Sequence, residues 1–108
     1  MSVCSIRKKD LNKRGIESFA EWLDRPDSVY IGRRQVYVQG TFNSKWKNPF
    51  SVKKYGREGC IQKYREMIVG SELMQDLEEL RGKELGCWCF PEKCHGDVLL
   101  ELLESRRM

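Results

Sequence analysis

The chain has 108 residues, and its 20 lysines and arginines outnumber its 16 aspartates and glutamates, which gives a formal net charge of +4. Hydrophobic residues make up 40% and charged residues 33%, a mixture typical of a globular chain that argues against a disordered one. No apolar run approaches the ~20 residues of a membrane span, and the N-terminus lacks the apolar stretch of a signal peptide. We therefore expect one cytoplasmic domain over residues 1–108, in a bacterial or host cell, with no membrane partner.

The first part of the chain alternates strand patterns with a helical pattern. After Asn12, a residue type that often caps helices, the apolar residues Ile16, Phe19 and Leu23 recur at helical spacing. Alternating apolar residues predict three short strands in this part, at Val3–Arg7, Ser28–Gly32 and Val36–Gln39. Only three residues separate the second and third of these strands, so we expect a hairpin there.

The second part of the chain contains most of the predicted helices. Residues Gly40–Ser51 are predicted to form a structured loop, because they combine a turn signal at Asn48–Pro49 with several aromatic residues. Helical periodicity and a last strand then follow, with helices at Arg57–Ile68, Glu72–Leu80 and Asp97–Glu104 and the strand at Glu84–Cys89. The interleaved order predicts an α/β fold, with a sheet of about four short strands packed with three or four helices.

Three of the five cysteines lie close together, beside the only histidine of the chain. Residues two apart in a strand share a face, so Cys87 and Cys89 should point to one side and Trp88 to the other. Cys94 and His95 follow, just before the last predicted helix. Three thiolates and one imidazole are ligands that zinc prefers, although this spacing is not that of a familiar zinc ribbon. One interpretation is therefore a zinc site made of Cys87, Cys89, Cys94 and His95.

Two other interpretations of the cysteine cluster stay open. In the first, the thiols pack under the last helix as small apolar groups. Alternatively, the positive end of the helix dipole favours the thiolate form of Cys94, with His95 as its base or ion-pair partner. Cys89 would then resolve an oxidised Cys94, as in a redox or sensor protein.

The predicted start of the last helix is also a candidate anion site, because its first N–H groups have no partner within the helix. Gly96 would allow a ligand to approach the backbone closely. Asp97 is expected to cap the first turn, or else to serve as an acid or base toward a ligand. If the chain is an enzyme, its candidate catalytic residues are His95, Asp97 and Cys94.

Two further segments combine cations with aromatic residues. Arg33 follows a predicted strand, where a guanidinium can bind phosphate, although an exposed hairpin arginine is an equally ordinary interpretation. Lysines alternate with aromatic residues in Lys45–Phe50, which suits a base and a phosphate, or a loop that its own aromatic residues anchor to the core. The candidate ligand-binding residues are Tyr30, Gly32, Arg33, Lys45, Trp46, Asn48, Pro49, Phe50, Arg57, Trp88 and Gly96.

Five segments together carry a resemblance to a known family: Tyr30–Arg33, Lys45–Phe50, Arg57–Glu58, Leu80–Cys89 and Pro91–Leu99. They are similar to domain-of-unknown-function family 4326, which occurs in phages, bacteria and some eukaryotes, and the likeness covers about residues 29–103. The chain departs from the family pattern in having Lys47 where a glycine is usual and a longer segment over Arg34–Ser44. The resemblance implies that the motif residues form one shared site, and it implies no particular activity.

Three functions follow from these patterns. The leading prediction is a site for a nucleotide-type or other anionic small ligand, in which Arg33, Lys45 and the helix start hold phosphate. Trp46 or Trp88 would stack on a base, whereas the lack of a glycine-rich phosphate loop argues against ATPase or kinase activity. The second is a zinc-stabilised module that binds nucleic acid or protein, with steep salt dependence and unfolding by chelators. The third is a thiol redox or sensor protein.

Overall fold

The structure is a computed structural model that describes residues 2–88, 92 and 94–105. In chain order the elements are β1 (Ser2–Ser5), α1 (Lys8–Lys13), α2 (Phe19–Leu23), β2 (Ser28–Tyr30), α3 (Val52–Val69), the 3-10 helix η1 (Glu72–Leu80), β3 (Glu84–Cys87) and α4 (His95–Ser105). The three strands form one parallel sheet in the order β1-β3-β2. The predicted α/β class is confirmed.

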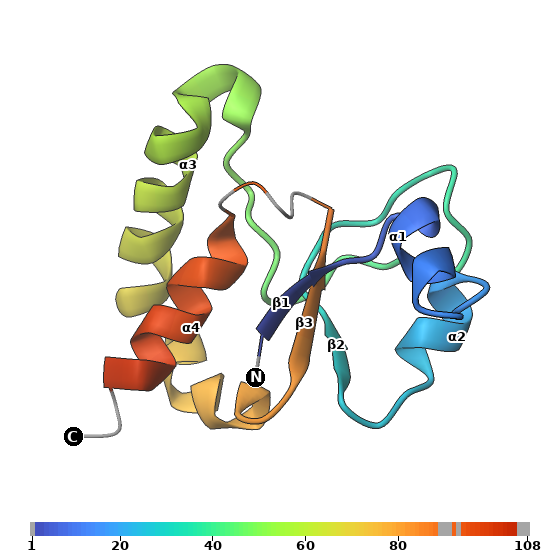
Figure 1. The fold of residues 1–108 in the computed structure, drawn as a ribbon. Coiled ribbons are helices and arrows are strands. Elements are labelled where there is room, and N and C mark those ends of the chain that lie inside the picture. The colour runs from blue at the N-terminus through green and yellow to red at the C-terminus, as the bar shows by residue number, and fades with distance from the viewer. Residues whose placement is uncertain (1, 89–91, 93, 106–108) are drawn as a thin grey trace.

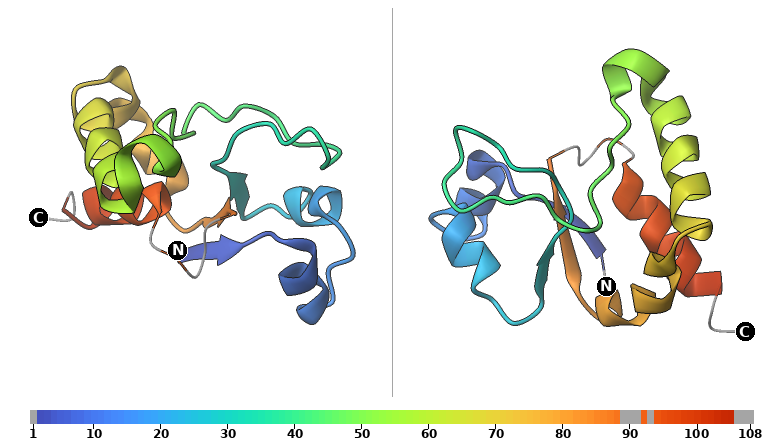
Figure 2. Two further views of the ribbon diagram at one scale, coloured as in Figure 1. Left: turned by 90° about the horizontal axis from the view of Figure 1, so that it is seen from above. Right: turned by 180° about the vertical axis from the view of Figure 1, so that it is seen from behind.

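The sheet lies between two groups of helices (Figures 1 and 2). The helices α3 and α4, with η1, cover one face, and α1 and α2 lie on the other. Successive residues of β2 and the residue after it point to the two faces in turn. Val29 and Ile31 pack on the α3–α4 side, and Tyr30 packs on the α1–α2 side. This division is that of a β-strand, in which successive side chains point to opposite faces of the sheet.

The larger core lies between the sheet and the two long helices. The inner face of α3 carries Cys60, Ile61, Tyr64 and Ile68, which recur every three or four residues and are all buried. The hydroxyl of Tyr64 donates a hydrogen bond of 2.6 Å to the carbonyl of Trp46, so the helix also holds the preceding loop. This core fixes the position of α3 and α4 relative to the carboxyl end of the sheet.

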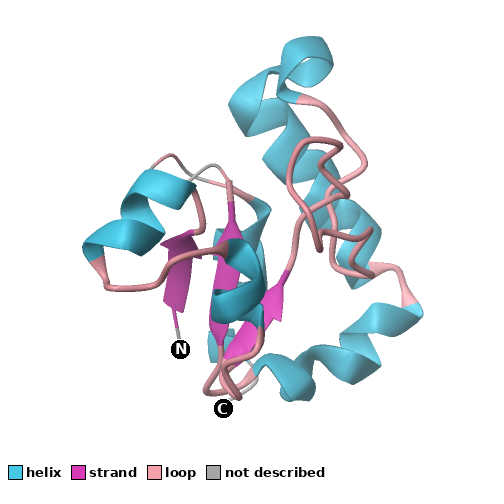
Figure 3. Cartoon of the chain, turned by 90° about the vertical axis from the view of Figure 1, so that its right-hand side faces the viewer, coloured by secondary structure: helices cyan, strands magenta, loops and turns pink. Residues whose placement is uncertain are grey.

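The predicted strand and hairpin over Val36–Gln39 are wrong. The chain between β2 and α3 runs as one long loop (Figure 3), and Tyr37 is 100% exposed. The backbone N–H of Gln35 donates to Thr41 Oγ1 at 2.8 Å, and the backbone N–H of Arg34 donates to Asn43 Oδ1 at 3.1 Å. Side chains within the loop therefore take the hydrogen bonds that a strand ladder would need.

The single helix expected after Asn12 is replaced by two short helices. Asn12 lies inside α1, and the cap of α2 is Ser18, whose Oγ accepts a hydrogen bond of 3.2 Å from the N–H of Glu21. No helix in the described part of the chain is long and apolar enough to cross a membrane.

The later elements match the prediction closely, with shifted ends. Strand β3 ends at Cys87 and α4 begins at His95, two positions before the predicted Asp97. Helix α3 contains a break at Gly56, which has φ 74° and ψ 165°, so its regular part begins near the predicted start at Arg57. Residues with side chains rarely adopt that backbone conformation, which explains a glycine at this point.

Candidate functional site

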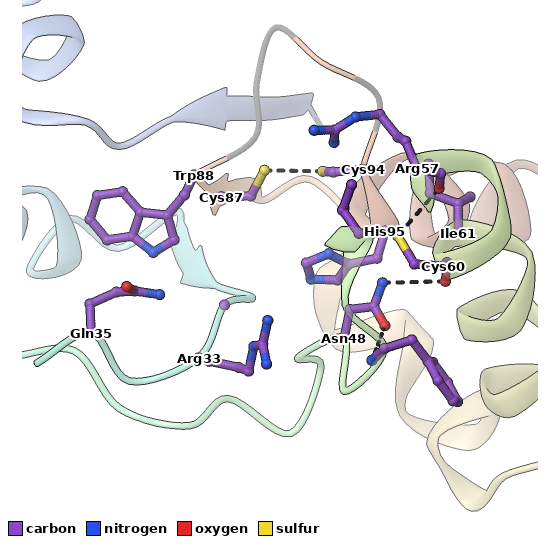
Figure 4. A pocket seen from close by; sticks show the side chains of 13 residues that line it. Arg33, Gln35, Asn48, Arg57, Cys60, Ile61, Cys87, Trp88, Cys94 and His95 are labelled. Carbon is purple, nitrogen blue, oxygen red and sulfur yellow. Dashed lines mark hydrogen bonds between the residues drawn. The ribbon is translucent and has the colours of Figure 1, made fainter. Parts of the chain in front are cut away.

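A cavity of about 160 Å³ lies at the carboxyl ends of β2 and β3 (Figure 4). Five segments converge on it: the loop after β2, the end of the long loop, the first turns of α3, the end of β3 and the start of α4. In open α/β sheets, ligands bind beyond the carboxyl ends of the strands, so the position itself is typical of a binding site. The lining residues are Gly32, Arg33, Gln35, Asn48, Phe50, Val52, Arg57, Cys60, Ile61, Cys87, Trp88, Cys94 and His95.

The cavity brings together most of the candidate residues of the sequence and leaves others outside. The candidates that line it are Gly32, Arg33, Asn48, Phe50, Arg57, Cys87, Trp88, Cys94 and His95. The candidates that do not line it are Tyr30, Lys45, Trp46, Pro49, Gly96 and Asp97. Cys89 lies outside the described residues. The lining residues that sequence reasoning missed are Gln35, Val52, Cys60 and Ile61. In the sequence, Cys60 and Ile61 stand out only as core-facing positions of a helical pattern. Nothing in the sequence marks Gln35 or Val52 as a site residue.

Two arginines give the cavity a positive character. Arg33 extends from the loop after β2, and Arg57 reaches in from the first turn of the regular part of α3. In Figure 4 they lie on opposite sides of His95. The guanidinium of Arg33 forms no hydrogen bond or ion pair with any residue that the structure describes. An anion in the cavity would therefore meet at least one guanidinium that no described carboxylate neutralises.

His95 is buried beside the cavity, with 8% of its surface exposed. Its Nε2 lies 2.6 Å from the carbonyl oxygen of Ile31, and because a carbonyl only accepts hydrogen bonds, Nε2 carries the proton. Burial lowers the pKa of His95 to about 4, an effect that the carbonyl of Ile31 opposes and the charge of Arg33 strengthens. The imidazole is therefore neutral near pH 7, and Nδ1 keeps its lone pair.

Side chains at the start of α4 accept hydrogen bonds from backbone N–H groups of the same turn. The N–H of Cys94 donates to Asp97 Oδ2 at 2.9 Å, and the N–H of Gly96 donates to Cys94 Sγ at 3.3 Å. This is a reciprocal capping arrangement with a cysteine at the position where serine or threonine is usual. Asp97 thus caps the helix, as one of its two interpretations predicted.

Gly96 has a packing role in the structure. A Cβ atom at this position would lie 2.8 Å from Cγ2 of Val3 and 2.9 Å from Cδ1 of Ile31. The glycine therefore allows α4 to approach the sheet closely, and the residue is buried away from the cavity.

Cys87 and Cys94 are neighbours at the cavity. Their sulfur atoms lie 3.0 Å apart, and both side chains are buried. Trp88 belongs to the opposite side of the sheet, as the strand pattern predicted. Among residues 2–88, 92 and 94–105, no group of three or more His, Cys, Asp or Glu side chains is arranged to hold a metal ion. Because Cys89 lies outside that range, the zinc site stays a prediction.

Tyr30 does not line the cavity but supports the turn that carries Arg33. Its hydroxyl donates to the carbonyl of Arg33 and accepts a hydrogen bond of 2.8 Å from Trp88 Nε1. Burial raises the pKa of Tyr30, which keeps the hydroxyl protonated and able to donate. Tyr30 is only 2% exposed, so the structure gives it the role of fixing the turn that carries Arg33.

Lys45 and Trp46 pack against η1 and do not reach the cavity. Lys45 Nζ forms ion pairs with Glu79 at 2.8 Å and with Asp76 at 3.2 Å. The indole of Trp46 is 2% exposed, and its Nε1 donates to Glu79 Oε1 at 3.3 Å. This segment therefore matches the alternative interpretation, in which the loop is anchored to the core by its own aromatic residue.

Asn48 connects the end of the long loop to α3. Its Nδ2 donates to the carbonyl of Cys60 at 3.4 Å, and its Oδ1 accepts from the N–H of Phe50 at 2.9 Å. Pro49 between them is exposed and does not line the cavity. The Asn-Pro-Phe motif thus positions one wall of the cavity, with Phe50 as a lining residue.

Comparison with known proteins gives a family and no activity. No solved structure matches the chain. The chain is 45% identical over 86 residues to an uncharacterised protein of Acanthamoeba polyphaga mimivirus, covering 68% of this chain and 65% of that protein. It is 33% identical over 70 residues to an uncharacterised 12.4 kDa protein from the nrdA-td intergenic region of Enterobacteria phage T4, covering 60% of this chain and 62% of that protein. The chain thus spans slightly less than two thirds of each relative. The model of one family, "Domain of unknown function (DUF4326)", matches residues 12–105, so the chain belongs to that family, as its motifs predicted.

Proposed function

We propose that the cavity at the carboxyl ends of β2 and β3 binds a phosphate-bearing small ligand of nucleotide type. The observation that carries the proposal is the convergence of Arg33 and Arg57 on either side of the neutral His95. Guanidinium groups bind phosphate through paired, charge-assisted hydrogen bonds. The net charge of +4 also favours an anionic partner.

The size of the cavity limits which part of such a ligand it can enclose. Sites that enclose a whole drug-sized ligand have volumes of roughly 300–1,000 Å³. The cavity of about 160 Å³ is smaller, which suits a phosphate group with part of a sugar. The rest of the ligand would lie toward Trp88 and Gln35, which Figure 4 shows together on one side of the site.

Trp88 replaces Trp46 as the aromatic partner in this proposal. Trp88 lines the cavity, whereas Trp46 is buried against η1. The Trp88 indole is held in place by its hydrogen bond to Tyr30 and by its stacked contact with Phe19, whose ring centroid lies 6.2 Å away. A fixed aromatic ring loses little entropy when a base stacks on it.

His95 would act as a hydrogen-bond acceptor for the ligand. With the proton on Nε2, the lone pair of Nδ1 is free to accept from a sugar hydroxyl or a protonated phosphate oxygen. A bound phosphate would in turn favour the imidazolium form and raise the pKa of His95 from its value of about 4. The proposal is therefore one of binding, in which ligand and His95 protonation are coupled.

Calorimetric titration with adenosine monophosphate, inorganic phosphate and adenosine tests the proposal. Arg33→Gln should weaken the binding of both phosphate-bearing compounds by about tenfold to a hundredfold, since a hydrogen bond to a charged group contributes ~1.5–3 kcal/mol. The matched control is Arg34→Gln, an exposed neighbour that does not line the cavity and should leave affinity unchanged.

The three compounds separate the parts of the proposal. Adenosine alone should bind much more weakly than adenosine monophosphate, because it lacks the phosphate that Arg33 contacts. Equal losses for Arg33→Gln and Arg34→Gln would indicate a nonspecific charge effect and contradict the proposal, as would an absence of binding by both phosphate-bearing compounds.

A further inference from the structure

Two cysteines from separate elements meet at the edge of the cavity. Cys87 is the last residue of β3, and Cys94 immediately precedes α4. Their sulfur atoms are 3.0 Å apart (dashed in Figure 4), whereas a disulfide needs ~2.05 Å. A movement of the two side chains by about 1 Å would therefore bring the sulfurs to bonding distance.

The surroundings of the two sulfurs differ, and the difference assigns them different roles. Cys94 caps α4, so its sulfur accepts a hydrogen bond from the N–H of Gly96 and lies at the positive end of the helix dipole. Both effects favour the thiolate, which is the attacking form of a cysteine. Both cysteines belong to the buried cluster on the α3–α4 side of the sheet, but Cys87 ends strand β3 and does not cap a helix.

The cavity gives a small reagent a route to these sulfurs. Cys87 and Cys94 are 1% and 3% exposed, so a bulky thiol reagent would not reach them directly. Both nevertheless line the cavity of about 160 Å³, whose volume is several times that of a water-sized molecule. Hydrogen peroxide is small and polar enough to enter a space lined by two arginines and a histidine.

We propose that Cys94 and Cys87 form a peroxide-reactive dithiol pair, a redox-modification site that needs no bound ligand. The Cys94 thiolate attacks one oxygen of hydrogen peroxide, the O–O bond breaks, and Cys94 sulfenic acid forms with hydroxide, which becomes water on taking the Cys94 proton. The Cys87 sulfur then attacks the Cys94 sulfur, the S–S bond forms, and the hydroxyl leaves as a second water with the Cys87 proton. Two thiols are thus oxidised to a disulfide, and one peroxide is reduced to two waters.

Peptide mapping of the whole chain after treatment with one equivalent of hydrogen peroxide tests the pair. The intact mass should fall by two hydrogen atoms, and digestion after alkylation should yield a Cys87–Cys94 linked peptide. Cys4 and Cys60 should be recovered alkylated; the sulfur of Cys60 lines the same cavity but donates to the carbonyl of Arg57 at 3.3 Å. A link from Cys94 to Cys89 or to Cys60, or recovery of all five thiols alkylated, would overturn the proposal.

Variants test which sulfur attacks. Cys87→Ala should accumulate a sulfenic acid on Cys94, which dimedone labels once the oxidised protein is unfolded in urea, and Cys94→Ala should leave Cys87 unlabelled. Cys4→Ala is the matched control, because burial, with the charge of Glu84, raises the pKa of Cys4 to about 12 and makes it unreactive. Labelling of Cys87 in Cys94→Ala as fast as that of Cys94 in Cys87→Ala would contradict the assigned roles. Circular dichroism checks that each variant folds, and the wild-type linkage stands as a test in any case.

Discussion

The two ends of the long loop between β2 and α3 each place a cation near a tryptophan, and only one of them forms part of a site. At the first end, Arg33 lines the same cavity as Trp88 and has no carboxylate partner in the described part of the chain. At the second end, Lys45 pairs with Glu79 and Asp76. The sequence patterns are similar, so residue type alone does not decide which end is available to a ligand.

The difference comes from what lies opposite each cation. Arg33 lines the cavity with His95 at the start of α4, and no described carboxylate pairs with its guanidinium. Lys45 faces η1, whose exposed side carries carboxylates, and its hydrogen bond with Glu79 raises the pKa of Lys45. The protein thus supplies an anion for Lys45, whereas no described residue supplies one for Arg33.

The largest effect that separates the two ends is on stability. Trp46→Ala should lower the free energy of unfolding by about 3–5 kcal/mol, because a fully buried indole is removed from the core. Urea denaturation measures this loss. The fully exposed Tyr37 of the same loop is the control, since Tyr37→Ala should change stability by no more than ~0.5 kcal/mol. A stable Trp46→Ala protein that no longer binds adenosine monophosphate would mean that Trp46 stacks on the ligand.

The second effect belongs to the Arg33 end and depends on pH. His95 has a pKa of about 4 in the folded protein and 6.5 ordinarily, so the unfolded chain binds more protons between these values. Stability should be complete above about pH 6.5 and fall as the pH decreases toward 4, by about 2 kcal/mol between about pH 7 and about pH 5. Urea denaturation at a series of pH values measures the slope.

The variant His95→Asn, which leaves no histidine in the chain, should remove this slope. Glu84 does not interfere, because its contribution belongs to a lower range: burial opposes the shift, but hydrogen bonds from Arg14 and Trp22 lower its pKa to about 2. Its share of stability is thus present above about pH 4.5 and lost as the pH falls toward 2. An unchanged slope in His95→Asn would contradict the buried neutral imidazole.

The third effect is a small loss of stability at the Lys45 end. Lys45→Gln should cost less than ~1 kcal/mol of stability, because its ion pairs are about half exposed to solvent. The affinity for adenosine monophosphate should not change, in contrast to the loss expected for Arg33→Gln. Calorimetry of the two variants side by side makes the comparison, and a larger loss of affinity in Lys45→Gln than in Arg33→Gln would reverse our assignment of the two ends.

The smallest effect connects the ligand with the cysteine pair. Phosphate held between Arg33 and Arg57 would occupy the route by which peroxide reaches Cys94, so saturating phosphate should slow oxidation severalfold. The rate of formation of the Cys87–Cys94 link, followed by alkylation at timed intervals, measures this protection. The same concentration of chloride in place of phosphate is the control, and equal rates with the two anions would show that phosphate does not occupy the route.

Much of the fold was predictable because its signals are local. The helices α3 and α4 and the strands β2 and β3 follow from apolar periodicity and turn residues within each segment. The hairpin after β2 was predicted wrongly, because the pattern at Val36–Gln39 does not show that Thr41 and Asn43 take up the backbone hydrogen bonds. Nor does it show that β2 finds its partner in β3, far along the chain.

The site was predictable to the extent that parallel strands bring their carboxyl ends together. This rule explains why Arg33, Trp88 and His95 line one cavity. What the sequence lacks is the identity of partners across long separations, such as Glu79 for Lys45. The pairing of Cys94 with Cys87 was likewise one of several combinations that the spacing allowed.

Backbone amide chemical-shift mapping during titration with adenosine monophosphate tests the central claim most directly, because it locates the ligand without any mutation. The account predicts saturable shifts concentrated at Gly32, Arg33 and the first turn of α4, with the Lys45–Lys47 amides unaffected. Shifts centred on Lys45–Lys47 and η1, or shifts that increase linearly without saturation across the whole surface, would contradict it.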